Sequence, residues 1–266
     1  GKIDQVKKAL KFCLKNLNSG DYFGIVRFST ETESFSATLS EVNDENITKA
    51  ESFVSALKPV GGTAIEDALL KAIDFSRTQD SKDRPFLIVF LTDGMPTIGT
   101  TDEQAISTKV LKNMGDLSLR IFSFGVGTDV NTHLLDRLSS ETRAATQYAL
   151  PREDLELKLS SFYSKISEPV LANPRLSFSG PLRFSKLQPS NLPDLFKGEQ
   201  LVTLGRYSGG GSSTISLEGT VNGEKKNFNY EASFPSSSRD YEFIPRLWAT
   251  RRVGFLLDQI RLNGDN

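Results

Sequence analysis

The sequence is poor in the residues that build many kinds of site. Its 266 residues include one cysteine, Cys13, and one histidine, His133. An intrachain disulfide framework, a cysteine-based zinc site and a histidine-rich metal site are therefore excluded. No apolar run reaches the roughly 18 residues that a membrane-spanning helix needs. Glycine and proline, at 20 and 11 residues, are too few for a collagen-like or disordered chain.

The sequence also has no excess of either charge, since it contains 32 Lys and Arg residues and 33 Asp and Glu residues. A nucleic-acid-binding domain or a polybasic membrane binder would carry an excess of basic residues, so we expect neither partner. The hydrophobic share of 38% is enough for one or two buried cores. The chain opens at Gly1 without Met or a signal-peptide pattern and stops just after a helix, so we expect a fragment truncated at both ends.

Helical and strand patterns alternate over the first two-thirds of the chain. Residues 86–91 are six apolar residues in a row, which is typical of a strand buried on both faces of a parallel sheet. The alternation predicts an α/β fold with helices on both faces of an open sheet. The predicted helices are 4–17, 45–57, 64–76, 103–114, 131–140 and 153–167, and the predicted strands are 22–28, 33–40, 86–91, 120–126 and 145–150.

Near Pro169 the helical period gives way to short β-type runs. Asn222-Gly223, between two of these runs, is a hairpin signal, and a helix over 243–262 carries Trp248 as an expected core anchor. We therefore expect three regions: 1–168 as the α/β domain, 169–238 as a small antiparallel β unit, and 239–266 as a C-terminal helix. The predicted strands of the β unit are 175–178, 201–207, 214–221 and 226–234.

Two loop positions carry candidate chemistry. Thr63 follows Gly61-Gly62 before a helix, and with Glu66 it matches a capping box, which alone could explain both residues. Asp93 follows the apolar strand in Thr92-Asp93-Gly94, where Asp-Gly is usually a turn. However, ligands of open α/β sheets bind at the carboxyl ends of strands, and a hydroxyl with a carboxylate suits a hard cation. Both interpretations stay open.

The order of the motifs resembles a von Willebrand factor type A (VWA) domain. The matching segments are the helix opening at Gly1-Lys2-Ile3, GDYFGIVRFS at 20–29, GGTAIEDAL at 61–69, FLIVFLTDG at 86–94 and RIFSFGVG at 120–127. The resemblance implies a three-layer, Rossmann-like fold and a metal-ion-dependent adhesion site (MIDAS). In that site Thr63 would be the second-loop ligand and Asp93 the third-loop residue.

The same resemblance implies a first-loop Asp-x-Ser-x-Ser motif, which this sequence does not contain. We therefore expect region 1–168 to lack its first strand and first metal-site loop. The parent protein would hold Mg²⁺, Mn²⁺ or Ca²⁺ with one coordination position open to a carboxylate from a protein partner. With only Thr63 and Asp93, we expect this chain to bind Mg²⁺ weakly or not at all.

The C-terminal part, with FIPRLWA at 243–249 and RRVGFLLDQIRLNG at 251–264, resembles the segment after the VWA domain in inter-alpha-trypsin inhibitor heavy-chain-like proteins. Those proteins place a VIT domain upstream, which here would lie before Gly1. The family implies a cell-surface, periplasmic or secreted location.

Other chemistry-bearing residues have structural interpretations. Cys13 lies on the apolar stripe of the first helix and is expected to be buried and inert. His133 has no neighbouring nucleophile motif. Asp21 is expected to support a turn, and Gly125-Val126-Gly127-Thr128 lacks the Lys of a phosphate-binding loop.

We therefore expect a non-enzymatic protein-binding or adhesion module. One alternative is an intracellular VWA subunit that acts in assembly or beside a chaperone. The other is an α/β enzyme that uses the same sheet edge, although neither GxSxG nor a P-loop occurs in the sequence.

Overall fold

A computed structural model gives the conformation of most of the chain. It describes residues 2–59, 61–78, 86–115, 117, 119–150, 152–166, 169–196, 200–221, 224–238 and 240–263. The chain divides into two compact units, Gly1–Ser167 and Glu168–Asn266. Each unit is described by itself below.

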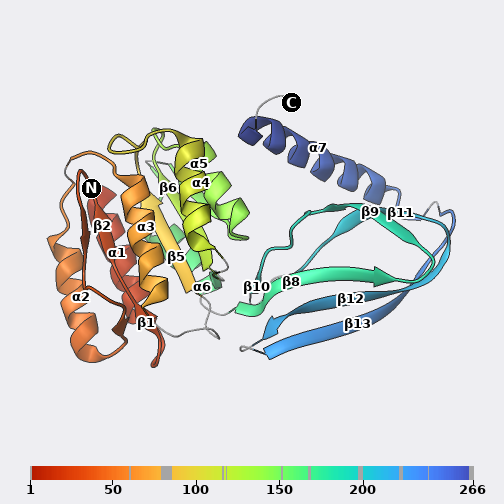
Figure 1. Ribbon diagram of the computed structural model, residues 1–266, viewed down its shortest axis with the longest axis horizontal. Helices are drawn as coiled ribbons and strands as arrows, with labels where there is room; N and C mark the ends of the chain where they lie inside the picture. Colours follow the sequence, from red (N-terminus) through yellow and green to blue (C-terminus); the bar gives the residue numbers. More distant parts are fainter. Residues whose placement is uncertain are drawn as a thin grey trace. The chain divides into compact units, whose positions relative to one another are not determined.

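In the first unit, helices and strands alternate along most of the chain, as the sequence patterns predict (Figure 1). The helices are α1 (Lys2–Lys15), α2 (Asp44–Ala56), α3 (Ile65–Arg77), α4 (Glu103–Met114), α5 (Thr132–Glu141) and α6 (Leu155–Ile166). The strands are β1 (Tyr22–Phe23), β2 (Val26–Phe28), β3 (Thr32–Ser34), β4 (Ser40–Glu41), β5 (Phe86–Thr92), β6 (Leu119–Val126) and β7 (Thr146–Ala149).

The central sheet of this unit is parallel, with the strand order β5-β6-β7. Strand β5 pairs with β6 from Phe86↔Leu119 to Thr92↔Gly125, and β6 pairs with β7 as far as Val126↔Ala149. Parallel pairing brings the carboxyl ends of all three strands to one edge of the sheet. The short strands pair antiparallel, β1 with β4 and β2 with β3.

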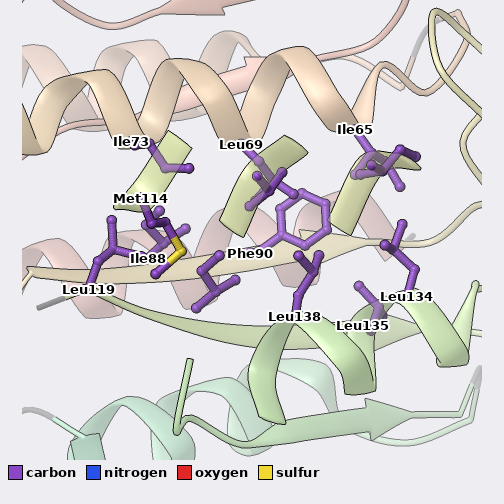
Figure 2. Close-up of a cluster of buried hydrophobic side chains, with 13 residues drawn as sticks. Ile65, Leu69, Ile73, Ile88, Phe90, Met114, Leu119, Leu134, Leu135 and Leu138 are labelled. Atoms are coloured by element: carbon purple, nitrogen blue, oxygen red, sulfur yellow. The ribbon is translucent and has the colours of Figure 1, made fainter. Parts of the chain in front are cut away.

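Helices cover both faces of this sheet, which confirms the predicted α/β class. On one face, α3, α4 and α5 contribute to a buried cluster, and Figure 2 shows Leu69 of α3 and Leu138 of α5 on either side of Phe90. On the other face, the ring of Phe162 in α6 lies 5.5 Å from that of Phe122 and 6.0 Å from that of Phe124. Successive residues of a strand point to opposite faces, so β6 is covered on both sides.

Three strand predictions need correction. The strand predicted over 33–40 is two short strands, β3 and β4, separated by residues 35–39. Strand β5 is not buried on both faces along its length, because buried and half-buried positions alternate from Ile88 to Thr92; the strand buried at all eight positions is β6. The strand predicted over 22–28 is two strands, β1 and β2, separated at Gly24. A Cβ at Gly24 would lie 3.0 Å from the ring of Phe75, so α3 approaches the backbone closely at this break.

The second unit contains antiparallel strands and a long helix. One sheet has the order β10-β8-β12-β13, and β9 pairs with β11. Strands β9 and β10 had no counterpart among the predictions, and Asn222-Gly223 lies outside the described residues. The elements are β8 (Pro169–Ser179), β9 (Arg183–Gln188), β10 (Leu195–Phe196), β11 (Leu204–Ser208), β12 (Gly211–Val221), β13 (Glu224–Phe234) and α7 (Phe243–Asn263).

Trp248 links α7 to the strands of the second unit, as its predicted anchoring role requires. Its indole Nε1 donates a hydrogen bond to the carbonyl oxygen of Lys186 in β9 at 3.0 Å. The guanidinium of Arg206 in β11 lies 5.6 Å from the indole ring. The helix is therefore fixed on β9 and β11 by a half-buried side chain rather than by a fully buried core.

Candidate functional site

Thr63 is held at the carboxyl-end edge of the parallel sheet by two backbone contacts. Its N–H donates to Thr97 Oγ1 at 2.8 Å, and its carbonyl oxygen accepts from the N–H of Thr97 at 3.1 Å. Thr97 follows β5, so this reciprocal pair ties the loop before α3 to the loop after β5. Nothing in the sequence pattern pointed to Thr97, because a threonine near a turn carries no distinctive signal.

The two glycines before Thr63 are required by close packing. Gly61 has φ +83, and a Cβ there would lie 2.7 Å from Thr30 Oγ1. At Gly62 a Cβ would lie 2.5 Å from Ile98 Cγ1. Thr30 also accepts the N–H of Gly62 at 3.1 Å, so the loop after β2 joins the same junction. The Gly-Gly-Thr motif therefore lets three loops meet without steric overlap.

The Asp93–Gly94 turn lies directly beside Thr63. A Cβ on Gly94 would be 3.4 Å from Thr63 Oγ1, which is ordinary van der Waals contact. The N–H of Gly94 donates to Thr92 Oγ1 at 3.3 Å, so the turn is tied to the last residue of β5. Asp93 itself is exposed. The two residues predicted to share a site thus come from adjacent loops.

The capping-box interpretation of Thr63 and Glu66 is wrong. Helix α3 begins at Ile65 with Ala64 as its N-cap, and no side chain caps it. Glu66 instead forms an ion pair with Lys109 of α4, and its side chain is 8% exposed. The capping box fails because Glu66 turns toward α4 and Thr63 is bound through its backbone to Thr97.

Two opposing effects set the acidity of Glu66. Burial raises the pKa of its carboxyl, but hydrogen bonds from Lys109 and Thr100 and the charge of Lys109 outweigh burial. The pKa of Glu66 is therefore lowered from its ordinary value, and the carboxylate is charged at neutral pH. This negative charge is paired with Lys109, so it is not available to bind a metal cation.

A hydroxyl and an exposed carboxylate are donors of the type that Mg²⁺ and Ca²⁺ prefer, so Thr63 and Asp93 fit a hard cation in kind. Two side chains are, however, too few donors to hold such a cation firmly. Among the residues that the structure describes, no group of three or more His, Cys, Asp or Glu side chains is placed to hold a metal ion.

The family assignment follows from the whole arrangement of strands and loops. The model of the von Willebrand factor type A domain matches residues 1–146 of this chain. The chain belongs to the von Willebrand factor type A family. The fold and the resemblance predicted from the motifs are thereby confirmed.

The relatives extend this VWA assignment beyond the matched region. Human inter-alpha-trypsin inhibitor heavy chain H4 is 30% identical over 97% of this chain and 29% of its own length. Human heavy chain H6 is 31% identical over 97% of this chain and 21% of its own length. The chain is thus heavy-chain-like in both units, and it spans less than a third of these relatives.

Solved structures support the fold of the VWA chain. The von Willebrand factor type A protein from Catenulispora acidiphila superimposes with a TM-score of 0.66 and 16% identity, over 92% of this chain and 64% of that one. At this identity the likeness concerns the fold alone.

Other candidate residues of the VWA unit have structural roles. Burial raises the pKa of the Cys13 thiol to about 12, so it is protonated at neutral pH and a poor nucleophile. His133 Nδ1 lies 3.9 Å from Glu103 Oε2 on the surface. Asp21 supports a turn, since its Oδ2 accepts the N–H of Asn18 at 2.9 Å. At Gly125 a Cβ would lie 2.7 Å from the ring of Tyr148, so this glycine serves packing.

Proposed function

We propose that this VWA chain is a non-enzymatic protein-binding module, and that Thr63 and Asp93 belong to its metal-dependent adhesion site. The observation that carries the proposal is the junction of the two loops, where the Thr63 hydroxyl lies against Gly94. Ligands of open α/β sheets bind at such carboxyl-end edges. An exposed carboxylate beside a hydroxyl offers oxygen donors to a divalent cation there.

The partner in this proposal is a protein that supplies a carboxylate. When bound, the cation would offer an open coordination position to that group. In this chain, Thr63 would contribute its hydroxyl, and Asp93 would contribute its carboxylate directly or through water. Thr97 is a positioning residue, because both of its contacts to Thr63 run through the backbone and leave the Thr63 hydroxyl available.

The proposal also covers where the protein works. Similarity to inter-alpha-trypsin inhibitor heavy chains over both units favours a secreted, surface or periplasmic setting. None of the described helices has the length and hydropathy to cross a bilayer.

Cation binding at Thr63 and Asp93 is tested with Mn²⁺ and Mg²⁺ in the absence of a protein partner. We expect paramagnetic broadening by Mn²⁺ of the amide resonances of 61–64 and 92–95 at millimolar metal, and Asp93→Ala to abolish it. We expect Mg²⁺ affinity weaker than millimolar in calorimetry, because two protein oxygens compete poorly with bulk water.

Asp129→Ala is the matched control, since Asp129 is an exposed carboxylate after β6 at the same edge of the sheet. This variant should leave the broadening unchanged. Broadening that is spread over the surface, or that survives Asp93→Ala, would refute the assigned site. A millimolar or tighter Mg²⁺ affinity would instead refute the expectation of weak binding.

A further inference from the structure

Strand β13 forms one border of its sheet and is unusually long and regular. It pairs with β12 over eleven consecutive residues, from Glu224↔Val221 to Phe234↔Gly211, with no shift in register. Within the described residues, β12 is its only strand neighbour (Figure 1). Residues 224–231 are all exposed. Such an edge presents a row of backbone donors and acceptors to any strand that can pair with it.

The side chains of β13 separate by face, because a strand alternates. Phe228 and Tyr230 lie on one face, opposite Leu217 and Ile215 of β12, and are 40% and 55% exposed. The other face is polar, with Lys225 and Glu231 six residues apart. The apolar face of the sheet therefore continues to its open edge and stops at two half-exposed aromatic rings.

We propose that β13 pairs antiparallel with β13 of a second copy of this chain, about a two-fold axis at Phe228. In this register Phe228 faces its own counterpart. Lys225, three residues before the axis, then faces the Glu231 of the other copy, three residues after it. Two-fold symmetry repeats the Lys–Glu contact on the other side of the axis. Asn227 likewise faces Asn229, so two amides that can hydrogen-bond lie opposite each other.

The charges select this register and this occupant. A shift of the axis by one residue to Asn229 would place Lys225 opposite Ser233, and a shift to Asn227 would place Lys225 opposite Asn229. Both shifts lose the two opposite-charge contacts, and cross-strand contacts of this kind are what favour one register over another. An axis at Lys225 would also place Lys226 opposite Glu224, but it would place Lys225 opposite its own copy and would pair only residues 224–226 of β13. The alignment at Phe228 combines opposite charges with pairing along most of the strand, which is the reason for choosing a second copy over an unrelated strand.

Lysine on an edge strand usually prevents pairing with another strand. Lys225 and Lys226 would therefore oppose this dimer unless their charges were compensated. Lys226 is already neutralised within the strand, because its Nζ lies 2.5 Å from Glu224 Oε2. Lys225 has no ionic partner among the described residues, and the Glu231 of the second copy would supply one. Glu231 Oε1 accepts from Thr214 Oγ1 of β12 at 2.5 Å, which holds its carboxylate on the polar face of the sheet. The lysines therefore discourage other strands and allow this one.

Sedimentation velocity over a concentration series tests the association. We expect the mass to rise from 29.4 kDa toward twice that value. Lys225→Glu and Glu231→Lys should each hold the mass at 29.4 kDa, because each places like charges opposite each other. An equimolar mixture of the two variants should recover the dimer, since both cross contacts then join opposite charges. Lys112→Glu, on the exposed face of α4, is the control with the same change in net charge.

A cysteine pair tests the register independently of the charges. In a Cys13→Ser background, Phe228→Cys should give a disulfide-linked dimer on mild oxidation, because directly opposed positions are within disulfide reach. Tyr230→Cys should not, since its two copies would lie about 13 Å apart, four residues along the strand. Circular dichroism verifies that each variant is folded.

The proposal fails if the wild-type mass stays at 29.4 kDa to the highest concentration. It also fails if folded single-charge variants associate as the wild type does, or if their mixture gains no mass. Equal cross-linking of the two cysteine variants would refute the alignment at Phe228.

Discussion

Glu66 shows how a carboxylate on the apolar side of a helix becomes part of the packing. The residue is 6% exposed on α3, and its partner Lys109 comes from α4, so the ion pair joins two neighbouring helices of the VWA unit. Lys109 binds Oε1, and Oε2 has no hydrogen-bond partner in the part of the chain that the structure describes. The carboxylate is therefore only partly compensated and depends strongly on Lys109.

We predict that Lys109→Met lowers the free energy of unfolding by about 1–3 kcal/mol at pH 7, because it leaves a buried charge unpaired. The folded-state pKa of Glu66 is lowered, so the stability it contributes is present above the unfolded-state pKa and is lost as the pH falls through the folded-state value. Urea unfolding at pH 7 and in acid should show the difference between wild type and variant shrinking in acid.

Lys49→Met provides the comparison, since it breaks an i,i+4 pair with Glu45 whose side chains are 60% and 76% exposed. Its effect should stay within about 0.5 kcal/mol. A cost at Lys109 no larger than the cost at Lys49 would show that burial does not strengthen the Glu66 pair.

At the residue scale, the motifs led to the candidate site but not to the residues that hold it in place. Thr63 and Asp93 stand out because Gly-Gly-Thr and Thr-Asp-Gly flank predicted elements. Thr97 and Thr30 do not, since their contacts form across the chain between loops whose mutual placement depends on the fold. The spacing of Thr63 and Glu66 also allows a capping box, because spacing alone cannot distinguish a reach back to the backbone from a reach across to α4.

At the element scale, the order of helices and strands was predictable and the depth of burial was not. Six consecutive apolar residues made 86–91 look like the buried centre of the sheet. Yet β6, which includes Arg120 and Ser123, is the strand buried throughout. Burial depends on neighbours: β6 has strands on both sides and helices on both faces. In the described residues, β5 has a strand on one side only.

Near the start of β6, two hydroxyl groups bind backbone groups that a neighbouring strand would otherwise bind. Strand β7 pairs with β6 only from Ser123 onward. Just before that point, Thr142 Oγ1 accepts the N–H of Ile121 at 3.0 Å, and Ser139 Oγ lies 2.9 Å from the Ile121 carbonyl oxygen. Two side chains at the end of α5 thus bind the backbone N–H and C=O of Ile121, which β7 does not reach.

We predict that Ser139→Ala and Thr142→Val each lower the free energy of unfolding by about 1–3 kcal/mol, since each leaves a buried backbone group unpaired. Thr142→Val should also speed hydrogen exchange at the Ile121 amide. Ser140→Ala, at an exposed position of the same helix, should change stability by less than about 0.5 kcal/mol. Unchanged exchange at Ile121 in Thr142→Val would show that water or a local shift replaces the hydroxyl.

At the scale of the whole molecule, the change from helix–strand alternation to short β-type runs near Pro169 suggested separate regions. The division into two compact units falls at residues 167 and 168. We propose that these units unfold independently. The only tryptophan, Trp248, lies in the second unit, so its fluorescence reports that unit, and hydrogen exchange in β6 reports the first.

We predict that Leu138→Ala destabilises the first unit alone. Leu138 is fully buried among α3, α4 and β5, and emptying such a position costs about 2–5 kcal/mol. Exchange in β5 and β6 should accelerate while the urea midpoint of Trp248 fluorescence stays fixed. Leu171→Ala, in the buried part of β8, should do the reverse. If either variant moved both signals together, the two units would form one cooperative structure, and loss of core packing in the VWA unit would also weaken the β13 edge.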